Sequence, residues 1–227
     1  MAIIELVRDE LPYEINEEMK TLRTNLLFCG AEKQVILLTS SFSGEGKSTI
    51  SMELCQSLTE LDKKTLLIDA DMRKSVLRNK VRGPVPRKGL SHFLSGQCEL
   101  KDLIYKTSTP NLSVVFSGEI PPNPTELLSS SRFEDLLALG RKYFDYVIID
   151  CPPIGMVVDA AVAAKHCDGC MILIEAGGIK YRMAQDIVAK MRTTGCPILG
   201  IILNKVDRKK SSKYYGKKYE GYYQNEK

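Results

Sequence analysis

Six continuous apolar runs of strand length recur along this chain. They are QVILLTS (34–40), KTLLIDA (64–70), NLSVVFS (111–117), YVIIDC (146–151), GCMILIEA (169–176) and PILGIILN (197–204). Unbroken runs are typical of strands that are covered on both faces. Helical patterns lie between them, at about 48–60, from Pro124 through Leu137, and at about 180–192. This alternation predicts an α/β fold built on a doubly wound, mostly parallel sheet.

The remaining segments suggest how the chain is organised. Residues 14–28 have a helical pattern ahead of the first strand, and residues 78–89, rich in Pro, Gly and basic side chains, indicate an exposed loop. After Asp207 no hydrophobic period remains, which favours a flexible tail. We therefore expect an N-terminal helical segment (1–30), one α/β domain (31–206) and a flexible tail (207–227).

The tail holds most of the positive charge. Residues 205–227 contain eight basic and three acidic residues, a net charge of +5, which leaves −1 for residues 1–204 of a chain whose total is +4. The body therefore offers no basic face for nucleic acid, and we expect no nucleic-acid partner. Five of the ten tyrosines lie within ten residues of this tail, at Tyr214, Tyr215, Tyr219, Tyr222 and Tyr223. That stretch has no aliphatic residue with which to build a core.

Composition indicates whether the chain is globular, membrane-spanning or secreted. The chain is 44% hydrophobic and 26% charged, as in ordinary globular domains. No apolar run approaches the roughly 18 residues of a membrane span, and the acidic N-terminus does not fit a signal peptide. We therefore expect a soluble, intracellular chain. Its seven cysteines are scattered and are interpreted as small core residues, with a redox or metal role for Cys167 and Cys170 (HCDGC) as the alternative.

A glycine-rich segment, SFSGEGKST, follows the first strand. Its GKST end has the P-loop pattern, in which backbone N–H groups cradle phosphate oxygens and Lys47 reaches the β and γ phosphates. The Ser48 hydroxyl suits Mg²⁺, and the helix that starts here directs its positive end at the anion. The usual first glycine of the pattern is Ser41 in this chain. The segment predicts a P-loop NTPase fold.

Three aspartates follow strands of the same predicted sheet. LLIDADMR places Asp69 and Asp71 at the end of one strand, and VIIDCPP places Asp150 at the end of another. The carboxyl ends of parallel strands share one edge, where ligands bind near the switch in strand order. Buried carboxylates need partners, so a cation or a lysine is expected beside them. The alternative for Asp69 and Asp71 is that they cap a helix or bind Arg73.

These motifs together resemble the bacterial tyrosine kinases. They are SGEGKST, LLIDADMR, VIIDCPP and the terminal tyrosine cluster, and GEIPPNPTELLSSSRF (118–133) and EEMKTLRTNLLF (17–28) also resemble segments of that family. Its members are P-loop kinases, unrelated to the eukaryotic kinase fold, that accompany capsule and exopolysaccharide synthesis. The resemblance covers essentially the whole chain. Because no apolar run is long enough to span a membrane, the chain is similar to the soluble, split form of these kinases found in Gram-positive bacteria.

The resemblance implies an ATP- and Mg²⁺-dependent protein tyrosine kinase that modifies its own five tail tyrosines. Lys47 and Ser48 would bind phosphate and metal, and Asp71 and Asp150 would help to hold Mg²⁺. Asp69 would orient or deprotonate the attacking phenol. Arg73 would neutralise charge on phosphate or bind a carboxylate within the site. The expected nucleotide-binding residues are Ser43, Gly44, Glu45, Gly46, Lys47, Ser48, Thr49 and Asn204.

The resemblance also implies partners. The family's oligomerisation motif ExxRxxR reads Glu17, Lys20 and Arg23 here, and lysine lacks the bidentate fork of arginine. We expect a homo-oligomer of ring type, a membrane adaptor that supplies an activating segment, protein tyrosine substrates and a phosphatase. The chain would then be cytoplasmic and held at the inner face of the membrane. Each phosphate adds roughly −1.5 to −2 charges, so three would cancel the charge of the tail and loosen the assembly.

Three other interpretations remain open. A positioning ATPase would share the strand order, but its extra P-loop lysine, five residues before Lys47, is Phe42 here. LNKVD (203–207) matches the guanine-reading pattern NKxD of GTPases, although related ATPases use such an asparagine for adenine. The basic, tyrosine-rich tail is also compatible with binding a membrane surface or single-stranded nucleic acid.

Overall fold

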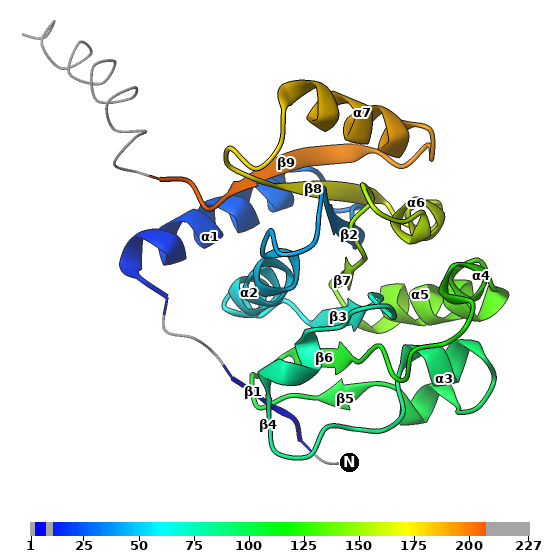
Figure 1. Cartoon of the computed structure of the whole chain (residues 1–227). Coiled ribbons are helices and arrows are strands. Elements are labelled where there is room, and N and C mark those ends of the chain that lie inside the picture. The colour runs from blue at the N-terminus through cyan, green and yellow to red at the C-terminus, as the bar shows by residue number, and fades with distance from the viewer. Residues whose placement is uncertain (1–2, 8–10, 208–227) are drawn as a thin grey trace, which may run out of the picture.

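The centre of the molecule is a seven-stranded sheet (Figure 1). The computed structural model describes residues 3–7 and 11–207. The strand order is β5-β6-β3-β7-β2-β8-β9, and every neighbouring pair is parallel except β5 with β6. The strands are β2 (Val35–Ser40), β3 (Thr65–Asp69), β5 (Tyr105–Lys106), β6 (Leu112–Val115), β7 (Tyr146–Asp150), β8 (Gly169–Glu175) and β9 (Ile198–Asn204).

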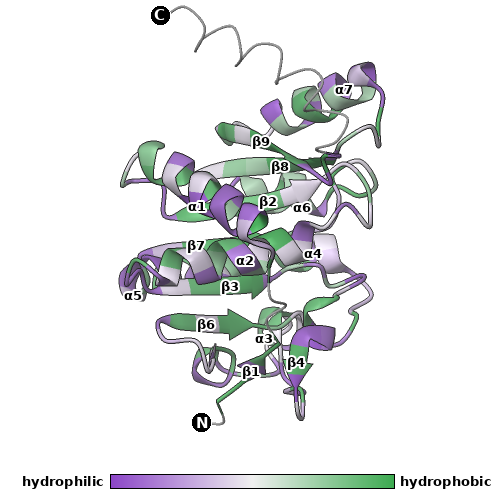
Figure 2. Ribbon diagram, turned by 90° about the vertical axis from the view of Figure 1, so that its left-hand side faces the viewer, coloured by the Kyte–Doolittle hydropathy of each residue, from purple (hydrophilic) through white to green (hydrophobic). Residues whose placement is uncertain are grey.

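Helices cover both faces of this sheet. The two hydrophobic clusters show which helices pack on which face. Ile36 and Leu38 of β2 pack with one group of helices, whereas Val35 and Leu37 pack with the other. The first group is α1 (Tyr13–Phe28) and α2 (Lys47–Thr59). The second is α3 (Leu90–Leu94), α4 (Pro124–Leu128), α5 (Ser131–Tyr143), α6 (Asp159–Ala164) and α7 (Tyr181–Arg192). Figure 2 shows the hydrophobic strands β3, β6 and β7 beside helices that carry hydrophilic residues.

The predicted fold class is confirmed. The six apolar runs form β2, β3, β6, β7, β8 and β9, each within a few residues of the expected bounds. The central strands are buried on both faces because helices lie on each side. For β9 the expectation of two covered faces is wrong. It is the edge strand, and Ile201 and Leu203 are 53% and 58% exposed.

The short elements were not foreseen. The predicted exposed loop 78–89 instead contains most of a 3₁₀ turn, η1 (Leu77–Lys80), and β4 (Val81–Arg82), which pairs antiparallel with β1 (Glu5–Leu6). A second 3₁₀ turn is η2 (Leu100–Asp102). The helical pattern after Pro124 is split at Ser129 and Ser130 into α4 and α5. Strands of two residues carry no periodicity, which is why the sequence did not indicate them.

The sheet places the predicted site at one edge. Asp69 and Asp150, the last residues of β3 and β7, are direct partners in the parallel register. β7 also pairs with β2, and the glycine-rich loop directly follows β2. The switch in strand order falls here, because β3 and β6 lie on one side of β7 whereas β2, β8 and β9 lie on the other.

Arg23 connects α1 to α2. Its side chain is buried, and its guanidinium donates to the backbone oxygen of Ser57 at 2.6 Å and to Glu60 at 3.1 Å. Lys20, by contrast, is exposed and pairs with Glu17 on the same helix at 2.7 Å. In this chain Arg23 therefore has partners within its own subunit, and the assembly role of these three residues stays a prediction.

We expect Arg23→Ala to lower the free energy of unfolding by about 1–3 kcal/mol, because a buried acceptor and a carboxylate lose their donor. Urea unfolding measures this. Lys20→Ala is the matched control and should leave the unfolding midpoint almost unchanged. Equal effects of the two substitutions would contradict the connecting role of Arg23.

Candidate functional site

The loop between β2 and α2 borders a cavity at the carboxyl edge of the sheet. Gly44 and Gly46 adopt left-handed φ angles of 89° and 97°. A Cβ at Gly46 would lie 2.5 Å from Nδ2 of Asn204, so this position requires glycine for its conformation and for space. Because α2 begins at Lys47, its free N–H groups and the positive end of its dipole face the loop.

Glu45 shapes this loop from within. Its side chain is only 4% exposed, and its carboxylate accepts backbone N–H bonds from Ser41 at 2.7 Å, Phe42 at 3.1 Å and Glu175 at 3.4 Å. These bonds tie the start of the loop to the end of β8. The side chain of Glu45 is thus committed to the fold, and only its backbone is left to meet a ligand.

The cavity itself has a volume of about 320 Å³. Most of the predicted phosphate-binding residues line it, together with residues of the loop after β3, among them Asp71, and one residue of the loop after β7. The complete lining is Ser40, Phe42, Ser43, Gly44, Gly46, Lys47, Ser48, Thr49, Asp71, Lys74, Val76 and Pro153. Asn204 lies outside this lining, and its amide donates to the backbone oxygen of Glu45 at 2.8 Å.

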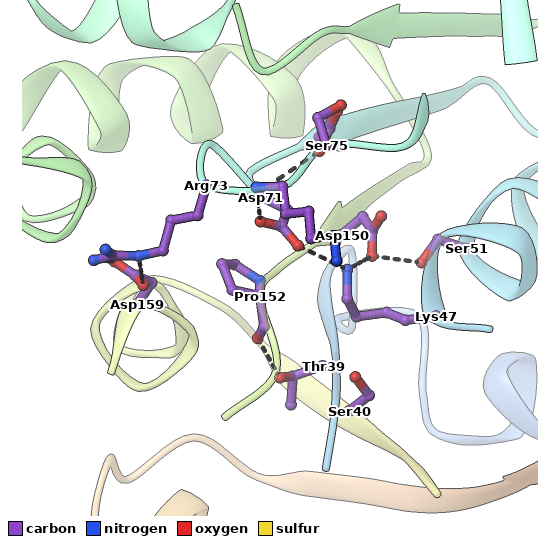
Figure 3. A network of polar contacts seen from close by, with 12 residues as sticks. Thr39, Ser40, Lys47, Ser51, Asp71, Arg73, Ser75, Asp150, Pro152 and Asp159 are labelled. Atoms are coloured by element: carbon purple, nitrogen blue, oxygen red, sulfur yellow. Dashed lines mark hydrogen bonds and ion pairs between the residues drawn. The ribbon is translucent and has the colours of Figure 1, made fainter. Parts of the chain in front are cut away.

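Lys47 lies between two of the predicted aspartates (Figure 3). Its ammonium is 2.5 Å from Asp150 Oδ1 and 3.8 Å from Asp71 Oδ2, and its side chain is 7% exposed. Burial opposes the charged form of Lys47, but the attraction of Asp150 and then Asp71 outweighs it and raises the pKa. Ser51 on the next turn of α2 also reaches Asp150, at 3.4 Å. The lysine and two of the carboxylates therefore converge.

Asp69 lies deeper than Asp71. It is 1% exposed, it does not line the cavity, and it accepts bonds from the Ser75 hydroxyl and from the backbone N–H of Asp71 at 3.2 Å. Burial, together with the nearby charge of Asp150, raises the pKa of Asp69 to about 7. The position of Asp69 is suited to orienting the loop that carries Asp71.

Arg73 has a carboxylate partner, one of the two roles considered for it. Its guanidinium donates to both oxygens of Asp159, at 2.8 and 3.2 Å (Figure 3). The Thr125 hydroxyl donates a further bond to Asp159 at 2.7 Å. Asp159 is fully buried. Burial tends to raise the pKa of this carboxyl, but the bonds from Arg73 and Thr125 prevail and lower it. This pair fixes the loop after β3 to the start of α6.

Several residues at this edge were missed by sequence reasoning. Thr39 accepts a bond from the Ile154 N–H at 3.0 Å and donates to the backbone oxygen of Pro152 at 2.7 Å, which joins β2 to the loop after β7. Asp159 and Thr125 complete the Arg73 contact. Only Asp159 left a signal, as an acid at the start of an alanine-rich helical stretch.

The donors at this edge fit Mg²⁺. Ser48 and Asp71 line one cavity, and Asp150 is next to it because it binds Lys47, which also lines the cavity. The side chains of Ser48, Asp71 and Asp150 all offer hard oxygen atoms. Within residues 3–7 and 11–207 no group of three or more His, Cys, Asp or Glu side chains is arranged to cage a metal. Mg²⁺ commonly uses one or two carboxylates and completes its shell with substrate phosphates and water.

No cysteine lines the cavity. Cys170 is buried in β8, Cys167 packs against the same hydrophobic cluster, and all seven cysteines are free. None of the described helices is long and apolar enough to cross a membrane.

Comparison with known proteins identifies the family. Residues 33–178 match the family model described as an AAA domain. Tyrosine-protein kinase CpsD of Streptococcus agalactiae is 44% identical over 209 residues, 91% of each chain. Tyrosine-protein kinase YwqD of Bacillus subtilis is 34% identical over 91% of this chain and 89% of its own length. The chain belongs to the bacterial P-loop tyrosine kinases.

Solved structures agree with this family. The chimerical protein CapA2B2 superposes with a TM-score of 0.80 at 30% identity, covering 91% of this chain and 94% of that one. MinD of Pyrococcus horikoshii, a septum site-determining protein complexed with Mg-ADP, reaches a TM-score of 0.64 at 23% identity, covering 77% of this chain and 71% of its own. At that identity the second likeness shows the fold alone. The resemblance to bacterial tyrosine kinases inferred from the motifs is confirmed.

The raised pKa of Asp69 predicts that the stability of the protein depends on pH. Because the folded state binds this proton more tightly than the unfolded state does, protonated Asp69 adds to the free energy of unfolding. That contribution is complete below pH 4 and is lost as the pH rises through about 7. Asp69→Asn removes this titration. The free energy of unfolding of the variant, minus that of the unchanged protein, should therefore rise by up to ~4 kcal/mol between pH 4 and pH 8.

Urea unfolding at four pH values across this window measures the difference. Asp135→Asn, on the exposed face of α5, is the control for exchanging a carboxylate for an amide. A difference that is constant with pH would contradict the raised pKa of Asp69.

Proposed function

We propose that this protein is an ATP- and Mg²⁺-dependent protein tyrosine kinase that phosphorylates the tyrosine cluster of its own C-terminal tail. The observation that carries the proposal is the convergence of Lys47, Asp71 and Asp150 beside a glycine-rich loop at the start of a helix. Membership in the tyrosine kinase family, at 44% identity, supports the reaction type.

The nucleotide would bind with its phosphates in the cavity. The backbone of residues 43–49, the Lys47 ammonium and the N-terminus of α2 supply positive potential there. Ser48, Asp71 and Asp150 would hold Mg²⁺, which neutralises charge on the β and γ phosphates when bound. Lys47 neutralises Asp150 and Asp71 in this structure, and its ammonium would be available to bind phosphate if those carboxylates held the metal.

In the reaction, a tyrosine oxygen forms a bond to the γ-phosphorus as the bond from that phosphorus to the β–γ bridging oxygen breaks, releasing ADP. The transition state is loose, so the phenol proton leaves late and water accepts it. Lys47 would stabilise the charge that develops on the transferred group. Asp69, which lies behind the cavity lining, would orient Asp71. Arg73 would hold the loop after β3 in place by binding Asp159.

The end of the described chain supports the tail as the substrate. β9 ends at Asn204, whose amide donates to Glu45 of the glycine-rich loop. The predicted phosphoacceptors Tyr214, Tyr215, Tyr219, Tyr222 and Tyr223 lie outside the described residues. A coil of 7–16 residues spans roughly 15–24 Å, a reach compatible with phosphorylation within one subunit or of a neighbour. Presentation by a neighbour in a ring would raise the local acceptor concentration to about the millimolar range.

We further propose a role in capsule or exopolysaccharide synthesis, with a membrane adaptor that activates the kinase and holds it at the inner face of the membrane. The support is that the chimerical protein CapA2B2 superposes on 91% of this chain. Tyrosine-protein kinase wzc of Salmonella typhi is 32% identical, although this chain spans only 29% of its length.

Incubation with Mg-ATP followed by intact mass measurement tests the kinase. We expect mass steps of one phosphate each, confined by peptide mapping to residues 208–227. Lys47→Met should abolish them, because the ammonium that meets phosphate is gone. Replacement of the five tail tyrosines by phenylalanine is the second control and should also remove the steps. Phosphate elsewhere in that variant would contradict the tail as the main acceptor.

Nucleotide choice separates the kinase from a GTPase. If LNKVD serves an adenine nucleotide, Mg-ADP should raise the melting temperature by several degrees, whereas Mg-GDP at the same concentration should not. Differential scanning calorimetry measures both. A larger shift with Mg-GDP would favour the GTPase interpretation.

A further inference from the structure

The last residue of β9, Asn204, and the next residue, Lys205, contact the glycine-rich loop from outside the cavity. Lys205 Nζ donates to the backbone oxygen of Gly44 at 2.8 Å and to Glu175 Oε2, also at 2.8 Å. Asn204 Nδ2 donates to the backbone oxygen of Glu45 at 2.8 Å. Two consecutive carbonyl groups of the loop are therefore bound by the Asn204–Lys205 pair.

These bonds determine where the loop's N–H groups point. In a planar trans peptide the C=O of one residue and the N–H of the next point in opposite directions. Because the carbonyls of Gly44 and Glu45 are turned toward Lys205 and Asn204, the N–H groups of Glu45 and Gly46 are turned away from them. N–H groups aimed into a loop of this kind are the donors that bind phosphate oxygens.

The backbone of Lys205 is unusual as well. Its φ is 56°, in the left-handed region that non-glycine residues seldom adopt. Such conformations persist where surrounding contacts determine them, and they concentrate at functional sites. Here the contacts are the two bonds of the side chain.

Stability does not account for this arrangement. The side chains of Lys205 and Glu175 are 46% and 36% exposed, and ion pairs with this much solvent around them contribute little to folding. The bond to the Gly44 carbonyl has a more specific effect, because it selects one orientation of a glycine that is itself at φ 89°.

We propose that Lys205 is a positioning residue for nucleotide binding. It acts through the Gly44 carbonyl, which it holds outward so that the following N–H groups face the phosphates. The inference rests on the proposed nucleotide-binding function and extends it to a residue outside the cavity lining. It also gives a role to the lysine of LNKVD that does not involve reading the base.

The test is the affinity for Mg-ADP, measured by isothermal titration calorimetry on the full chain. Lys205→Met keeps the aliphatic part of the side chain but removes the donor, and should raise Kd about tenfold. Lys205→Arg keeps a cationic donor and should restore Kd to within about twofold to threefold. Lys165→Met, an exposed lysine at the end of α6, is the matched control and should leave Kd unchanged.

Two readouts separate positioning from a general structural role. In the mass assay, Lys205→Met should raise KM for ATP and leave kcat nearly unchanged, because binding of ground state and transition state weakens equally. Lys205→Gly relieves the left-handed backbone while removing the donor, so it should weaken Mg-ADP without lowering the urea midpoint.

The outcomes are distinguishable. If the unchanged protein fails to bind Mg-ADP, both the proposed function and this inference are wrong. If it binds but Lys205→Met binds equally well, only the positioning role is wrong. A fall in urea midpoint for Lys205→Gly that matches its loss of affinity would likewise reject positioning in favour of a structural role.

Discussion

The buried charge cluster around Lys47 is the constraint on which the rest of the site depends. Asp69 and Asp150 are register partners on adjacent strands, and Asp71 follows two residues later, so the parallel sheet itself brings negative charge together. In a low-dielectric interior such carboxylates need a cation. Lys47 supplies it at 2.5 Å from Asp150, and burial with the charge of Asp150 raises the pKa of Asp69 to about 7. The proposed Mg²⁺ site makes use of the same surplus of negative charge at this edge.

Sequence patterns predicted the parts of the molecule that repeat or that have a fixed spacing. Continuous apolar runs predicted the parallel strands, and GKST and the two strand-end aspartate motifs predicted which residues meet at the carboxyl edge. A contact between two residues that are distant in the chain produces no repeating pattern in the sequence. Arg23 belongs to the predicted assembly motif, and that motif did not indicate its buried contacts with Ser57 and Glu60. Likewise the bond from Arg73 to Asp159 spans 86 residues and follows from the packing of α6.

The fold alone does not distinguish this family from its relatives. MinD superposes with a TM-score of 0.64, and at 23% identity that likeness shows the fold alone. In this chain Phe42, five residues before Lys47, lines the cavity and is 37% exposed. A shared fold does not by itself imply a shared activity.

Helix α2 joins two regions that are otherwise far apart. It begins at Lys47 in the phosphate loop and ends at Thr59, a length of about 20 Å at 1.5 Å per residue. Near its far end, Ser57 accepts the bond from Arg23 of α1. Most residues of this helix are buried, from Lys47 at its start to Leu58 near its end. One element therefore carries both the lysine of the phosphate loop and the acceptor that holds α1.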